Sequence, residues 1–65
     1  MESPIQILRL PDVEKRLGMS RPTIYRWLQK DPCFPRPVKL GSHSVGWVES
    51  EINAWLGARI QSRSR

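Results

Sequence analysis

The side chains of this chain that could do chemistry are cations and hydroxyls rather than nucleophiles or metal ligands. The sequence contains one cysteine, Cys33, and one histidine, His43, which is too few for an internal disulfide or a four-ligand zinc site. It contains neither a histidine paired with a nucleophile nor a glycine loop that would cradle a phosphate. We therefore expect no enzymatic activity, no metal and no cofactor, and we interpret Cys33 as incidental.

The charge balance indicates a polyanionic partner. Eleven lysines and arginines against six acidic residues give a net charge of +5 over 65 residues. Such a balance favours nucleic acid first and an anionic membrane surface second. No apolar run approaches the ~20 residues of a membrane span, and the first residues lack the pattern of a signal peptide. We expect a cytoplasmic protein that does not bind membranes.

Two short helices joined by a tight turn are expected where the basic residues crowd. Residues 11–17 have a proline and acidic residues suited to a first helical turn, and Gly18 is suited to end the helix. Ser20 is a favourable N-cap, with a proline in the first turn of a second helix over residues 21–30. A gap of about three residues that contains glycine is typical of a helix-turn-helix.

The second helix has one apolar and one polar face. Its 3.6-residue period directs Ile24 and Leu28 inward, with Trp27 beside them and partly exposed. The opposite face has hydrogen-bonding and cationic groups and no carboxylate, as binding in a major groove requires. Its members are Pro22, Thr23, Arg26, Gln29 and Lys30.

A β-hairpin and a third helix are expected after this pair. Three prolines between residues 32 and 37 exclude a continuing helix, and β-prone runs at 38–40 and 45–47 flank a polar turn. Apolar residues at i, i+3 and i+4 predict an amphipathic helix from residue 49 to about 60. The fold class expected is mainly α with a small β-hairpin: a winged helix-turn-helix domain over residues 1–60, followed by a basic, flexible tail at 61–65.

This ordered set of segments closely resembles the AlpA family of small phage-type regulators, whose fold is a MerR-like winged helix-turn-helix related to phage excisionases. The resemblance covers roughly residues 7 to 57. The segments that carry it are LRL at 8–10, Val13, LGMSR at 17–21, TIYR at 23–26, FPRPVKLG at 34–41, VGW at 45–47, Glu51 and WL at 55–56. Members often have arginine at two positions of the wing where this chain has His43 and Gly46.

The resemblance implies a sequence-specific binder of double-stranded DNA encoded by a prophage or mobile element. The favoured role is a transcriptional regulator, and the alternative is an excisionase-like factor that bends attachment-site DNA and sets the direction of recombination. Further copies of the chain bound cooperatively, an integrase or RNA polymerase are the protein partners that these roles imply.

The candidate DNA-binding residues come from two segments. The start of a second helix is the end that a helix-turn-helix directs at base edges, and a wing lies along the backbone or in the minor groove. Arg26 is the leading candidate for a base contact, and His43 would contact phosphate when protonated. The full set is Ser20, Arg21, Thr23, Tyr25, Arg26, Lys30, Lys39, Ser42, His43 and Ser44.

Two other interpretations start from the same residues. A protein–protein adaptor would need an apolar anchor on the outer face of the second helix, which that face does not provide. A single-strand binder would use Phe34, Trp47 and Trp55 as stacking platforms. We expect Trp47 and Trp55 to pack in the core instead, because a chain of this size without disulfides needs large side chains inside.

Overall fold

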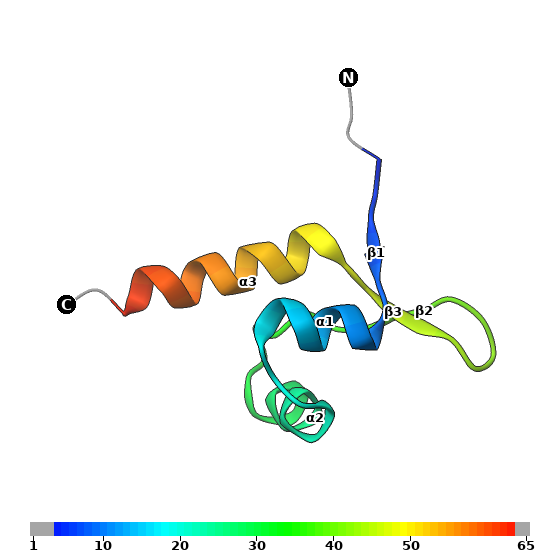
Figure 1. Cartoon of the computed structure of the whole chain (residues 1–65), viewed down its shortest axis with the longest axis horizontal. Helices are drawn as coiled ribbons and strands as arrows, with labels where there is room; N and C mark the ends of the chain where they lie inside the picture. Colours follow the sequence, from blue (N-terminus) through cyan, green and yellow to red (C-terminus); the bar gives the residue numbers. More distant parts are fainter. Residues whose placement is uncertain (1–3, 64–65) are drawn as a thin grey trace.

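Three helices lie to one side of a small antiparallel sheet in the computed structural model, which describes residues 4–63 (Figure 1). A winged helix-turn-helix is thereby confirmed as the fold class. Among the helices of residues 4–63, none has the length and hydropathy needed to cross a membrane. In chain order the elements are β1 (Ile7–Leu8), α1 (Leu10–Leu17), α2 (Arg21–Lys30), β2 (Val38–Lys39), β3 (Val45–Val48) and α3 (Glu49–Ser62).

The turn between α1 and α2 is built as the sequence predicts. Gly18 ends α1 with φ = 66° and ψ = 34°, the left-handed conformation that glycine adopts without steric cost. The N–H of Gly18 donates to the carbonyl of Glu14, and so does the N–H of Met19, at 3.1 Å. Helix α2 then spans Arg21–Lys30, as predicted.

Ser20 occupies the N-cap position of α2 but does not cap the helix with its side chain. Its backbone is extended, yet its hydroxyl accepts no hydrogen bond from a backbone N–H of the first turn. The hydroxyl lies instead 3.1 Å from Oγ1 of Thr23. Pro22 has no backbone N–H that the Ser20 hydroxyl could accept. The Thr23 hydroxyl competes with the Thr23 N–H for the Ser20 hydroxyl. The predicted capping bond is therefore wrong, although the helix start is right.

The predicted hairpin is present and forms part of a larger sheet. Strand β2 pairs with β3 in the register Val38 to Gly46 and Lys39 to Val45. The other edge of β3 pairs with β1, Leu8 lying opposite Trp47, so the strand order is β1-β3-β2. Sequence analysis missed β1, because two residues are too short a run to show an alternating pattern.

Gly46 allows β1 to lie close against β3. A Cβ atom at this position would lie 2.4 Å from Cγ2 of Ile7 and 3.1 Å from the carbonyl oxygen of Leu8. The residue is buried. This chain therefore has no room for a larger side chain at position 46.

The core lies where the sheet, the helices and the proline-rich loop meet. The three aromatic rings weighed as stacking platforms are all buried, with Phe34 1 %, Trp47 0 % and Trp55 7 % exposed. The indole Nε1 of Trp47 donates to the carbonyl of Pro35 at 3.2 Å, so its polar atom is satisfied inside the core. The prediction that Trp47 and Trp55 pack in the core is confirmed, and Phe34 is buried with them. Leu8, Val13, Ile24 and Ile52 complete the buried set.

Helix α3 extends further than predicted. It continues to Ser62, so Gln61 and Ser62, expected in the flexible tail, are helical. The last turn is closed by a 3.1 Å bond from the Ser62 hydroxyl to the carbonyl of Arg59. The C-terminal half of α3 projects beyond the other elements (Figure 1). Residues 64–65 of the predicted tail lie outside the described residues.

Candidate nucleic-acid interface

The outer face of α2 carries three of the candidate side chains in positions open to solvent. Ile24 is fully buried and directs the opposite face outward, where Arg26 and Lys30 are exposed and Thr23 is partly exposed. Figure 1 shows α2 at the edge of the molecule, seen almost along its axis, with α1 between it and the sheet. The helix contains no carboxylate, so no acidic group on α2 itself would repel a polyanion.

The N-terminal end of α2 gathers two hydroxyls and a cation. Ser20 and Thr23 bond to each other, and Arg21 is the first residue of the helix. Nε of Arg21 lies 3.8 Å from Oε2 of Glu14, a long ion pair at a side chain that is 64 % exposed. Exposed pairs of this kind contribute little, so Arg21 can exchange Glu14 for another anion.

Arg26 has no internal partner. Its side chain makes no hydrogen bond or ion pair within residues 4–63, and it stands one turn beyond Thr23. Tyr25 is 45 % exposed, so its ring is covered only in part. Nζ of Lys30 lies 5.9 Å from the centroid of the Trp27 ring, which is itself partly exposed as predicted.

Three other arginines in or near the basic segment act as internal ties. Nη2 of Arg16 lies 3.1 Å from Oε2 of Glu49, joining α1 to the start of α3. Arg36 donates from Nη1 and Nη2 to the carbonyls of Leu28 and Asp31, at 2.5 and 3.3 Å, and so closes the C-terminal end of α2. Nε of Arg9 donates to the carbonyl of Val45 at 3.0 Å. The sequence does not distinguish these arginines from Arg26, because the difference lies in tertiary contacts.

The wing, which is the hairpin of β2 and β3 with its loop, contains the other four candidate residues. Lys39 is exposed on β2, and Ser42 and His43 are exposed at the tip, with Oγ of Ser42 3.4 Å from Nδ1 of His43. Ser44 is partly buried, and its carbonyl accepts the N–H groups of Leu40 and Gly41 at 2.7 and 3.3 Å. The wing loop projects from the molecule on the side opposite the end of α3 (Figure 1). The candidates therefore form two groups, six at α2 and four on the wing.

The C-terminal end of α2 is joined to α3 through Asp31. The two carboxylate oxygens accept the backbone N–H of Cys33 at 2.9 Å and Nε1 of Trp55 at 3.1 Å. These two hydrogen bonds, the backbone bond first, lower the pKa of Asp31 below its ordinary value, and the charges of Arg59 and Arg36 add to the effect. The end of the helix thus holds an ionised carboxylate at neutral pH.

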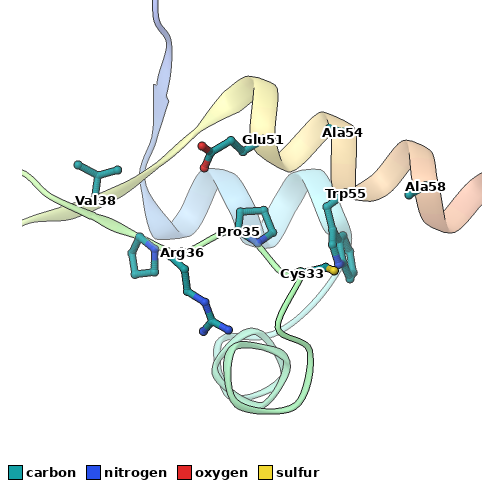
Figure 2. Close-up of a pocket in the computed structure, with 9 residues that line it drawn as sticks. Cys33, Pro35, Arg36, Val38, Glu51, Ala54, Trp55 and Ala58 are labelled. Atoms are coloured by element: carbon teal, nitrogen blue, oxygen red, sulfur yellow. The ribbon is translucent and has the colours of Figure 1, made fainter.

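A groove separates the proline-rich loop from α3. It has a volume of about 690 Å³ and is walled by Pro35 and Val38 on one side and by Ala54 and Ala58 on the other, with Trp55 at its base (Figure 2). None of the candidate residues lines it. Within the described part of the chain, no group of three or more histidine, cysteine or acidic side chains is placed to hold a metal ion.

Comparison with known proteins shows what this arrangement is similar to. The family described as "Prophage CP4-57 regulatory protein (AlpA)" matches residues 6–60. The "DNA-binding transcriptional activator AlpA" of Escherichia coli strain K12 is 48 % identical over 64 residues, which cover 91 % of each chain. The "Uncharacterized protein ORF88" of Enterobacteria phage P4 is 43 % identical over 60 residues, covering 92 % of this chain and 67 % of the phage protein. No solved structure matches the chain.

The family match spans almost every element that positions the two groups of candidate residues, from β1 through most of α3. It is a family of regulatory proteins and not of enzymes. This chain belongs to the AlpA family of prophage regulatory proteins.

Proposed function

We propose that this chain is a transcriptional regulator that binds double-stranded DNA in a sequence-specific manner and serves a prophage or other mobile element. Helix α2 enters the major groove, and the wing lies along the adjacent backbone or in the minor groove. The E. coli relative, which is 48 % identical, is named as a DNA-binding transcriptional activator, and this similarity supports the proposed function.

The observation that carries the proposal is the exposed, acid-free outer face of α2. Arg26 stands exposed on that face with no hydrogen bond or ion pair to any of residues 4–63, while other arginines are engaged in tertiary contacts. A guanidinium group held on a rigid helix can donate to O6 and N7 of guanine together, and the Thr23 methyl suits contact with a thymine. Ser20 and Arg21 at the start of the helix suit phosphate, since a helix N-terminus favours an anion.

A protein–protein adaptor is the weaker assignment. Adaptor surfaces concentrate their energy in buried aromatic or apolar anchors. On α2 the most exposed aromatic side chain is Tyr25, 45 % exposed, which lies in sequence four residues after Arg21 and directly before Arg26. This face would bind an adaptor partner poorly. It matches a DNA groove well in both charge and hydrogen-bonding groups.

Several copies of the chain are expected to act together on DNA. A domain of this size contacts few base pairs, so useful specificity requires neighbouring copies on repeated sites. We expect a monomer in solution and an ordered array on DNA, which equilibrium sedimentation with and without DNA would test. A stable dimer of the free protein would contradict this expectation.

The function is tested by fluorescence anisotropy of labelled duplexes across a salt series. Each phosphate contact should add about 0.9 to the slope of log affinity against log salt. Footprinting across a promoter and an attachment site of the parent element then distinguishes two roles. Protection of the promoter indicates a regulator that works with RNA polymerase, and protection of the attachment site indicates an excisionase-like partner of an integrase. Absence of duplex binding at low salt would overturn the proposal.

A further inference from the structure

Two cations from different helices share the ring of Trp27. The guanidinium carbon of Arg59, on α3, lies 4.8 Å from the centroid of the Trp27 ring and 5.4 Å from that of Trp55. Nζ of Lys30, on α2, lies 5.9 Å from the Trp27 centroid. Both cations are exposed to solvent. The helix-turn-helix and the end of α3 therefore present positive charge at one place.

The cations at this place exceed the acid that faces them. Asp31 is the nearby carboxylate, and it lowers the local positive potential. Its two oxygens are already engaged by the N–H of Cys33 and the indole of Trp55. Neither Lys30 nor Arg59 forms an ion pair within residues 4–63. Arg26 stands beside them, and together with Trp27 and Lys30 it lines a small hollow of about 70 Å³.

The position of Arg59 relative to α2 indicates which strand of backbone this positive charge would face. In Figure 1 the wing projects to one side of α2 and the C-terminal half of α3 extends to the other. A duplex that received α2 in its major groove would present phosphate backbone on both sides of that helix. The wing would contact the backbone on one side of α2. On the other side, Arg59 is the α3 cation that lies against α2, on the ring of Trp27.

We propose that Arg59 and Lys30, held on the ring of Trp27, bind a backbone phosphate of the duplex on the side of α2 away from the wing. The proposal rests on the DNA-binding function argued above and adds α3 to the surface that contacts DNA. Cation–π contact with the rings of Trp27 and Trp55 holds the guanidinium in place before DNA arrives, so less side-chain entropy is lost on binding. The contact is to phosphate, so it anchors the protein without reading sequence.

The phosphate contact of Arg59 and Lys30 on the Trp27 ring forms an anchor, which substitution of Arg59 tests through the salt dependence of binding. Arg59→Gln removes the charge, and Arg59→Lys retains it. Arg63→Gln is a matched control, since Arg63 lies one turn further on with its side chain exposed and contacts neither indole. Anisotropy is measured on a preferred duplex and on an unrelated duplex from 0.05 to 0.3 M salt. Thermal unfolding of each variant reports any loss of the folded state.

The anchor predicts a pattern across these variants. Arg59→Gln should lower the slope of log affinity against log salt by about 0.9 and weaken both duplexes about fivefold to tenfold at 0.1 M salt. Arg59→Lys should restore most of the slope, and Arg63→Gln should change it by much less. A slope unchanged by Arg59→Gln, or lowered equally by Arg63→Gln, overturns the anchor while leaving DNA binding intact. Failure of the unmodified protein to bind any duplex overturns both proposals.

Discussion

The indole Nε1 of Trp55 donates a 3.1 Å hydrogen bond to Oδ2 of Asp31, so α3 is bonded directly to the residue at which α2 ends. The other carboxylate oxygen accepts the N–H of Cys33 at the start of the proline-rich loop. The end of α2, the loop that directly follows it and the distant helix α3 therefore meet at one carboxylate. Because α2 carries most of the proposed DNA contacts, this junction fixes the direction in which those contacts face.

Acid should weaken this junction. The pKa of Asp31 is lower in the folded chain than its ordinary value of about 3.9, so its stabilising effect is complete at neutral pH. That effect is lost as the pH falls from about 5 through the ordinary value and past the folded one. Asp31→Asn should therefore lower the thermal midpoint at pH 7, yet show a smaller further fall between about pH 5 and pH 2 than the unmodified protein.

Two further variants make the acid experiment specific. Trp55→Phe keeps a ring in the core and removes one donor to Asp31, so its pH profile should fall between the other two. Glu51→Gln alters an exposed carboxylate that has no hydrogen bond or ion pair in the described part of the chain. It should follow the unmodified protein. Parallel pH profiles for Asp31→Asn and the unmodified protein would contradict the role given to Asp31.

Ser20 should contribute little to stability. A serine that caps a helix typically contributes about 1 kcal/mol, but the Ser20 hydroxyl is bonded to the Thr23 hydroxyl rather than to a backbone N–H of the first turn. Ser20→Ala should therefore cost less than about 0.5 kcal/mol in urea unfolding. Gly18→Ala is the comparison, because it places a Cβ in a left-handed conformation and should cost roughly 1–2 kcal/mol. A loss of about 1 kcal/mol or more from Ser20→Ala would restore the capping role.

Sequence predicts those parts of this fold that local residue chemistry determines. Gly18 predicts the end of α1, and the prolines of the loop predict the end of α2. The spacing of Ile52, Trp55 and Leu56 predicts α3. The buried state of Trp47 follows from the need of a small chain for large core residues. These signals are local or compositional, so they can be recognised without coordinates.

The parts that sequence does not predict depend on contacts between distant residues. Strand β1 exists because β3 offers an edge next to Gly46, which no pattern around Ile7 reveals. The division of the arginines is similar, since Arg16 and Arg26 have the same chemistry and differ in what lies nearby. Arg59 is a further example, because its place on two indole rings results from the packing of α3 against α2.

Gly46→Ala should destabilise the sheet. The added methyl group would lie 2.4 Å from Cγ2 of Ile7 and 3.1 Å from the Leu8 carbonyl oxygen, so β1 would have to move. Overpacking of this kind typically costs about 1–3 kcal/mol, which urea unfolding can resolve. Gly41→Ala is the matched control, because a Cβ at Gly41 meets nothing within 4 Å. Equal stability of the two variants would show that β1 does not pack against Gly46.

Arg26→Ala should weaken binding selectively. A guanidinium that contacts guanine contributes both affinity and discrimination, so its loss should cost about 1–3 kcal/mol on the preferred duplex and relax the preference at one base pair. Arg26 is exposed and unpaired in residues 4–63, so stability should change by less than about 0.5 kcal/mol. Anisotropy on duplexes that vary one base pair at a time measures the change in preference. Arg63→Ala removes the same charge from the end of α3 and should affect every sequence alike. If Arg26→Ala also weakened all duplexes equally, Arg26 would be a phosphate contact, and base reading would have to come from Thr23 and its neighbours at the start of α2.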